Sequence, residues 1–413
     1  MWLAALLALL VSSAPQEPRE VLAQIRIQGN VATTDEEVRR LADVQVGMPF
    51  LPTTVDDVSA RLRQTRRFVS VQVLKRFASI SDPSQIVLVI ILDEGPVRIE
   101  MTGDPTNPTR VVKNNRPRFL YLPVLDAEDG YGLTYGLRLG LPDPAGARSR
   151  LSFPLTWGGD KRVGAELEKT FQDEPLERLT VGGSISRRTN PFYQQDDDRQ
   201  RVWVRGEREV RPKVRLGATA GWQHDSFLAL SDQVGQLGVD VVVDTRTDAV
   251  LPRDAIFAKA SVDYLRLPDG GASRTELDGR GYIGLFGQNI LAVRALRMDS
   301  DKPLPPYMKP LLGGMANLRG FAAGSAVGDT LVAGSAELIV PLSSPLEIGK
   351  IGVSGFVDTG TIYDKGQRFS DQSLKEGYGG SVWFAAAFVK INLAVAHGRG
   401  SSTRVHIGAD ITF

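Results

Sequence analysis

The chain has 413 residues, of which 42% are hydrophobic and 23% are charged, and its formal net charge is +1. This nearly balanced charge comes without a basic stripe interleaved with aromatic residues, so nucleic acid is not an expected partner. Beyond the N-terminus the longest apolar run is Ile86–Leu92, far short of the roughly 20 residues that a membrane-spanning helix needs. The sequence has no cysteine, which excludes disulfides and thiolate metal sites.

The N-terminus has the pattern of a secretory signal peptide. Residues Trp2–Val11 are apolar, and Ser12–Ala14 supply the small residues of a cleavage site. No Lys or Arg precedes the apolar stretch, which leaves a start codon further upstream as one alternative. A buried N-terminal helix is another. We expect residues 1–14 to be a signal peptide that directs export.

Residues 20–97 predict a small α+β domain with the order β-α-α-β-β. Thr34 and Glu37 form a capping box, which predicts the start of the first helix. The other elements follow from alternating or helically spaced apolar residues, namely Ile25 and Ile27 for the first strand, Val55, Val58 and Leu62 for the second helix, and residues 68–74 and 85–92 for the last two strands. The prolines that come next predict a linker over residues 98–116.

From residue 117 to residue 413, short segments alternate between apolar and polar positions. Transmembrane β-barrels and soluble β-sandwiches share this pattern, so alternation alone leaves both open. We expect sixteen strands, an even number as in bacterial barrels, at residues 117–125, 130–140, 148–157, 161–171, 176–188, 200–211, 212–223, 232–244, 254–265, 272–284, 288–298, 330–341, 349–359, 376–386, 388–398 and 403–413. Both ends of the barrel chain then lie on one side with the short turns. The longer connections, at 189–199, 225–232 and 299–329, lie on the other side, which favours the barrel.

The longest connection, residues 299–329, contains the sequence Leu318-Arg319-Gly320-Phe321. A buried arginine needs carboxylate partners, because its guanidinium stays charged. Glu337 and Asp358 lie on the polar faces of two later strands, so they point into the lumen if the apolar faces meet lipid. We therefore expect loop 299–329 to fold inside the barrel and Arg319 to pair with both carboxylates. A fixed latch is the preferred interpretation, and a switch element is the alternative.

These residues resemble a known family. The Leu-Arg-Gly-Phe loop, the strands Ala336–Pro341 and Phe356–Gly360, and the C-terminal Phe413 resemble the BamA/TamA-type outer-membrane superfamily. Residues 20–97 resemble a single POTRA domain, with the marks Ile27–Asn30, Gly47, Phe68 and Glu94–Pro96. The turn from Asp244 to Asp254 also resembles a family turn, except that Asp254 stands where a glycine is usual.

The resemblance implies a 16-stranded barrel in the outer membrane of a diderm bacterium, with the POTRA domain in the periplasm. It implies the same pairing of Arg319 with Glu337 and Asp358, and it assigns Phe413 to a C-terminal signal. The partners would be the outer-membrane bilayer and unfolded outer-membrane or secreted client polypeptides. Periplasmic chaperones or accessory subunits are further candidates.

The first and last strands must close the barrel against each other. Pro123 lies in the first strand and has no N–H to donate, which predicts a weak seam that could open to a client strand. The alternative is that Pro123 only marks the end of a short strand.

No enzyme motif stands out, and we expect no enzymatic activity, no cofactor and no metal. The three histidines, His224, His397 and His406, fall on separate segments, and Asp196–Asp198 is expected in a solvated outer loop, with weak calcium binding as a remote alternative. The preferred function is assembly or insertion of outer-membrane proteins. The alternatives are a secretion pore for one dedicated partner and a lipid-handling or structural barrel. A single POTRA domain counts against both a general assembly factor and a secretion pore.

Overall fold

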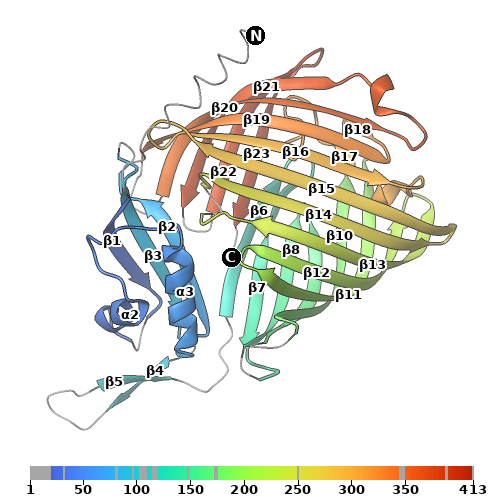
Figure 1. Cartoon of the computed structure of the whole chain (residues 1–413). Helices are drawn as coiled ribbons and strands as arrows, with labels where there is room; N and C mark the ends of the chain where they lie inside the picture. The colour runs from blue at the N-terminus through green and yellow to red at the C-terminus, as the bar shows by residue number, and fades with distance from the viewer. Residues whose placement is uncertain are drawn as a thin grey trace. The chain divides into compact units, whose positions relative to one another are not determined.

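The computed structural model describes residues 20–30, 33–79, 82–94, 97–101, 109–113, 120–146, 148–171, 175–248, 251–343, 349–386 and 389–411. The chain divides into two compact units, Met1–Asn114 and Asn115–Phe413 (Figure 1). The expected signal peptide, residues 1–14, and the C-terminal Phe413 lie outside the described residues.

The first unit holds the predicted order β-α-α-β-β, which is confirmed. Its described elements are β1 (Val21–Gln28), α2 (Asp35–Ala42), α3 (Thr54–Gln64), β2 (Ser70–Phe77) and β3 (Gln85–Asp93). The sheet order is β1-β3-β2, and β3 pairs in parallel with β1 and antiparallel with β2. Within the described part of the chain, no helix has the length and apolar content that crossing a membrane requires.

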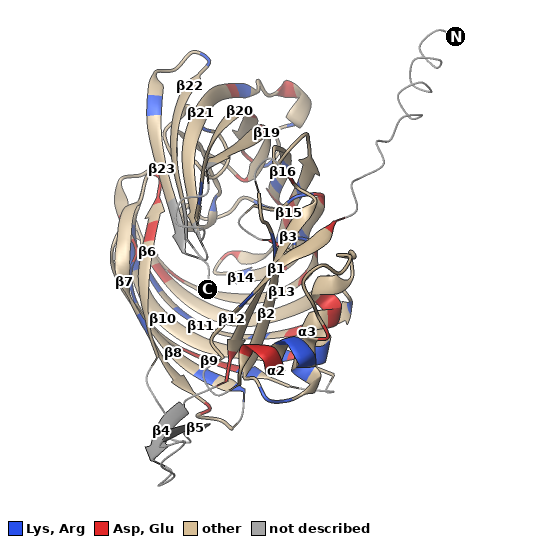
Figure 2. Cartoon of the chain, turned by 90° about the vertical axis from the view of Figure 1, so that its left-hand side faces the viewer, with Lys and Arg blue, Asp and Glu red and all other residues tan. Residues whose placement is uncertain are grey.

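Helix α2 begins where the capping box predicts. The Thr34 side chain accepts a hydrogen bond from the Glu37 backbone N–H at 3.3 Å, and the Glu37 carboxylate binds Arg67. Acidic residues occupy the first turn of the helix and basic residues its last turn, which suits the helix dipole. Figure 2 shows these charged segments on α2 and α3.

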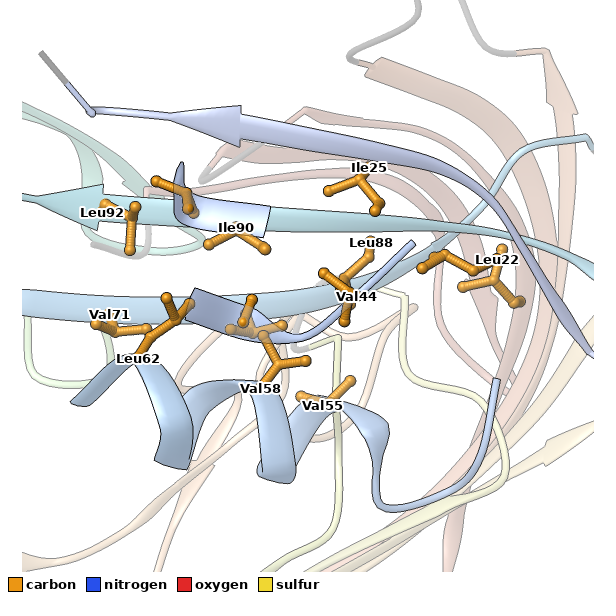
Figure 3. Packing of buried hydrophobic residues seen from close by; sticks show 14 of the residues in the cluster. Leu22, Ile25, Val44, Val55, Val58, Leu62, Val71, Leu88, Ile90 and Leu92 are labelled. Atoms are coloured by element: carbon orange, nitrogen blue, oxygen red, sulfur yellow. The ribbon is translucent and has the colours of Figure 1, made fainter. Parts of the chain in front are cut away.

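The core of this unit lies between the helices and one face of the sheet. Val58 and Leu62 of α3 are fully buried against Leu88 and Ile90 of the central strand β3 (Figure 3). Val55 of the same helix is 7% exposed, so all three predicted apolar positions of α3 face the core.

Residues 98–116 do not match the expected linker, because they contain most of a β-hairpin. Strands β4 (Val97–Met101) and β5 (Thr109–Lys113) pair antiparallel. Both strands are rich in β-branched residues, which favour extended backbone, and the prolines at positions 105, 108 and 117 lie outside them. The prolines led to the prediction of a linker, although they flank two short strands.

The second unit is a closed antiparallel barrel, and the predicted sixteen strands are confirmed among its described residues. They are β6 (Leu120–Glu128), β7 (Gly132–Pro142), β8 (Ser149–Gly158), β9 (Lys161–Thr170), β10 (Arg178–Asn190), β11 (Gln195–Arg211), β12 (Val214–Phe227), β13 (Leu230–Asp244), β14 (Ala255–Leu267), β15 (Gly270–Gly284), β16 (Ile290–Ser300), β19 (Thr330–Ser343), β20 (Gly349–Tyr363), β21 (Lys375–Ala386), β22 (Val389–Gly398) and β23 (Thr403–Ile411). We call the end of the barrel that carries Leu120 and Ile411 the terminal end, and the opposite end the loop end.

The exposed face of the barrel wall is apolar. Leu237, Val239 and Val405 point outward and are 62%, 61% and 62% exposed, whereas Asp358 and His406 point inward and are 2% exposed. A soluble sandwich would bury its apolar face instead. The inverted pattern is that of a transmembrane barrel.

Two expected long loops are tight turns. β11 begins at Gln195, so Asp196–Asp198 belong to a strand and not to a solvated loop. Asp198 pairs with Arg187 across the hairpin, with 2.7 Å between Arg187 Nη2 and Asp198 Oδ2. Likewise β12 ends at Phe227 and β13 begins at Leu230. Cross-strand pairs of opposite charge stabilise strand pairing, and here they extend the strands toward the loop end.

Candidate functional site

The long connection between β16 and β19 folds into the barrel as a compact loop, residues 301–329, which we call the lumen loop. It contains a 3₁₀ turn at Pro306–Met308 and two short strands, β17 (Leu311–Leu312) and β18 (Ala326–Val327), that pair with each other. Its apolar residues pack on inward-facing side chains of the wall, in a cluster of Leu296, Leu312, Leu318, Phe321, Leu331 and Ala333. Hydrophobic burial therefore holds the loop in the lumen.

Arg319 lies at the tip of this loop and binds two carboxylates from neighbouring strands. Its Nε and Nη2 donate to Asp358 Oδ2 and Oδ1 of β20, each at 2.7 Å. Its Nη1 donates to Glu337 Oε2 of β19 at 2.7 Å. The Arg319 backbone N–H adds a bond of 3.0 Å to Asp358. Both Arg319 and Asp358 are almost completely buried, at 6% and 2% exposure.

Further side chains fix the two carboxylates and the guanidinium. The Ser354 hydroxyl donates to Glu337 Oε1 at 2.5 Å and also contacts the Ser381 hydroxyl at 2.7 Å. The ring of Phe356 lies under the guanidinium, with 3.4 Å from Arg319 Cζ to the ring centroid. Every charge in the cluster thus has a partner, which is the condition for a stable buried ion pair.

Glycines let the backbone of the loop approach the wall closely. Gly320 has φ 91°, a left-handed conformation that other residues rarely adopt. A Cβ added at Gly377 of β21 would lie 1.9 Å from the Arg319 carbonyl oxygen, and one at Gly398 of β22 would lie 2.7 Å from the Phe321 ring. The Arg-Gly-Phe sequence therefore needs glycines on the strands that it touches.

The described residues of the first and last barrel strands share very little backbone pairing. Among the described residues, β6 and β23 share a single register pair, Ala127 with Ala409, whereas β23 forms nine such pairs with β22. Pro123 lies inside β6 opposite Leu137 of β7, and the strand continues to Glu128. The alternative interpretation of Pro123 as the end of a short strand is therefore wrong.

Family models match both units of the chain. The model of the Omp85 superfamily domain matches residues 129–408, and that of the POTRA domain, FtsQ-type, matches residues 21–80. The first match covers more than half of the chain. The protein belongs to the Omp85 superfamily. The recognised resemblance to BamA/TamA-type proteins with a POTRA domain is confirmed.

Solved structures share this Omp85 fold. BamA from Haemophilus ducreyi lacking POTRA domains 1–3 has a TM-score of 0.63 and 16% sequence identity, covering 95% of this chain and 84% of that chain. CdiB from Escherichia coli has a TM-score of 0.53 and 12% identity, covering 98% of this chain and 92% of that chain. No curated protein sequence matches the chain. An Omp85 barrel with a POTRA domain points to the bacterial outer membrane, and the superfamily is one of non-enzymatic barrels.

The sequence did not predict a second polar contact of this Omp85 loop. His406 of β23 accepts a hydrogen bond at Nε2 from the Gly320 backbone N–H, at 3.0 Å. Its Nδ1 lies 2.6 Å from Asp129 Oδ2, in the turn between β6 and β7. Alternation places His406 on the inner face of the last strand, but nothing in the sequence connects it with Asp129, 277 positions away.

The first part of the lumen loop of this Omp85 barrel is held by a separate set of hydrogen bonds, at the loop end of the barrel. The Tyr307 hydroxyl donates to Asp232 Oδ2 at 2.7 Å, and Arg199 donates to the Tyr307 carbonyl at 3.0 Å. Arg199 in turn binds Asp197 and Asp225, which are 5% and 0% exposed. Of the three carboxylates for which calcium binding was the remote alternative, Asp197 contacts Arg199 and Asp198 contacts Arg187. The described residues contain no group of three or more His, Asp or Glu that could hold a metal ion.

A cavity of about 690 Å³ with a mixed polar and apolar lining lies beside the lumen loop. Its lining includes Asp126 and Glu128 of β6, Arg188 of β10 and Asn392 of β22. Side chains from both sides of the seam thus face one space. The Omp85 barrel is packed on the side of β19 and β20 and open on the side of the seam.

Proposed function

We propose that this Omp85 protein is an assembly or insertion factor for outer-membrane proteins. The observation that carries the proposal is the seam of the sixteen-stranded barrel, where the described residues of β6 and β23 form one register pair. On the seam side, residues 120–126 of β6 and 403–408 of β23 have no strand partner among the described residues. Unpaired backbone of this kind is a template for an added strand.

The POTRA-type unit supplies a second edge. β2 is an outer strand that pairs only with β3 within the described residues. The other outer strand, β1, is partly covered, because Leu22 exchanges backbone hydrogen bonds with Gly47 and Met48. The β2 edge is therefore the better receptor for an extended client, and its main-chain bonds make few demands on client sequence.

In this proposal the barrel spans the outer membrane, and the POTRA-type unit receives clients on the periplasmic side. Unfolded outer-membrane proteins are the clients, with periplasmic chaperones or accessory subunits as further partners. The lumen loop acts as a latch that keeps the barrel in shape while the seam engages a client.

The test is depletion of the protein in its own host, followed by quantitative proteomics of the outer membrane. Loss of many barrel proteins is the result that we expect. Loss of one secreted protein would instead establish a dedicated secretion pore, and an unchanged outer-membrane proteome would leave a lipid-handling or structural role. Rescue by the unaltered gene and by an Arg319→Ala variant then shows whether the latch contributes.

A further inference from the structure

The barrel wall has a gap beside the loop end of the seam. Because Ala409 pairs with Ala127, residues 403–407 of β23 run past the end of β6 and lie beside the turn that holds Asp129 and Gly130. A cavity of about 260 Å³ occupies this place, and its lining includes Asp129, Gly130, Ala323 and His406. Backbone pairing therefore does not close the seam here.

A side-chain contact closes it instead. His406 on one side of the gap and Asp129 on the other are joined by the 2.6 Å contact of Nδ1 with Oδ2. His406 is 2% exposed and the side chain of Asp129 is 23% exposed, so the contact is shielded from competing water on the histidine side. A hydrogen bond to a charged group in such a setting is among the stronger ones in proteins.

The lumen loop holds both partners of this contact. Gly320 donates its backbone N–H to His406 Nε2. On the Asp129 side, Gly314 of the loop packs so closely that an added Cβ would lie 2.9 Å from Oδ2 of Asp129. Ala323 packs still more closely on Gly130, where an added Cβ would lie 2.5 Å from the Ala323 Cβ. The loop therefore bridges the gap from the inside.

The hydrogen-bond pattern makes the two contacts of His406 depend on each other. Since Nε2 accepts from Gly320, the neutral ring carries its proton on Nδ1 and donates it to Asp129. Withdrawal of the loop removes the bond that fixes this ring orientation. The two interactions are thermodynamically linked. The free energy by which the seated loop stabilises the His406–Asp129 contact equals the free energy by which that contact stabilises the seated loop.

We propose that His406 and Asp129 form a clamp that holds the loop end of the seam shut only while the lumen loop is seated. His406 is thus a positioning residue that couples the Arg319 latch to the seam. The clamp would regulate the seam of the proposed insertion function. The clamp is tested by a distance measurement on the barrel in the absence of client. Because no client is needed, failure of the clamp is distinguishable from failure of the insertion proposal.

The test uses spin labels on the full-length protein in nanodiscs. The chain has no cysteine, so Leu133→Cys on β7 and Val405→Cys on β23, both exposed and outward-facing, give one labelled pair across the seam. Double electron–electron resonance then reports the distance distribution. A second pair, Ile256→Cys and Ile283→Cys on the fully paired strands β14 and β15, reports on the rest of the wall.

We expect His406→Ala and Asp129→Ala to raise the population at long distances about tenfold at the seam pair, as for loss of a buried hydrogen bond to a charge. Arg319→Ala should act in the same direction, because it releases the loop. Asp129→Asn, which keeps an acceptor, should give a smaller change, and His397→Ala, whose side chain faces outward beside Tyr378, should give none. An unchanged seam distance in His406→Ala would overturn the clamp. Equal broadening at the second pair would also overturn it, because the effect would then be general loosening of the wall.

Discussion

Arg319 is the residue on which the lumen loop depends most. Removing one member of a buried, hydrogen-bonded ion pair leaves the others uncompensated, which costs ~3–5 kcal/mol. We expect Arg319→Ala to raise the protease sensitivity and the hydrogen exchange of residues 311–327. Arg319→Lys should recover only part of the protection, because an ammonium group cannot reproduce the two-pronged contact with Asp358. The matched control is Arg297→Ala, since Arg297 is half-exposed and pairs with Asp299 on the outer face.

A substitution at Gly377 is a second single-residue test of how the lumen loop is held. A methyl group at this position would collide with the Arg319 carbonyl oxygen, so we expect Gly377→Ala to unseat the loop even though every charge is kept. Gly355→Ala on the adjacent strand β20 should be silent, because an added Cβ there meets no atom within 4 Å. Hydrogen exchange of the loop distinguishes the two variants. Equal protection in both would show that the loop does not need close backbone approach.

Alternation along β19 and β20 predicted that Glu337 and Asp358 enter the lumen, and the family resemblance implied that these two are the partners of Arg319. Alternation was not enough for Asp129 and His406, whose proximity depends on how the first and last strands close the barrel. The Asp196–Asp198 run was misread for a related reason. Its charges looked solvated in sequence, but Arg187 on the neighbouring strand pairs with Asp198, and Arg199 on the same strand pairs with Asp197.

At the scale of secondary-structure elements, we predict that an extended client polypeptide binds along the edge of strand β2. A photo-crosslinking residue at Gln72, which is exposed on β2, should form adducts with a denatured outer-membrane barrel protein diluted from urea. The same residue at Gln24 on β1 should form few, because that edge is partly covered. Equal adducts at both positions would contradict selective pairing at the β2 edge.

Sixteen strands were predicted with most boundaries within a few residues, because a lipid-facing wall imposes strict alternation. The turns were predicted less well. The charged hairpins at the loop end extend further than hydrophobicity alone indicates, and the β4–β5 hairpin was hidden by flanking prolines. At Asp254, φ is 49°, so the left-handed turn persists without the usual glycine, as aspartate permits.

At the scale of the whole molecule, locking the seam tests whether it must open for the protein to function. Ala127→Cys with Ala409→Cys places two thiols on directly opposed residues in a protein that otherwise has none. If clients enter through the seam, oxidation should abolish rescue of the depleted strain and reduction should restore it. Single cysteine variants are the control. Full rescue by the oxidised protein would show that the seam need not open.

The position of the lumen loop in the chain also constrains how the barrel itself forms. Arg319 precedes Asp358 and His406 in sequence, yet both belong to strands that complete the wall after the loop. Until β20 is in place the guanidinium has no bidentate partner, and until β23 arrives the Gly320 amide has no acceptor. Seating of the loop is therefore coupled to the last steps of folding. The last strands of the wall must therefore assemble around the lumen loop, so the barrel closes on a filled lumen and not on an empty one.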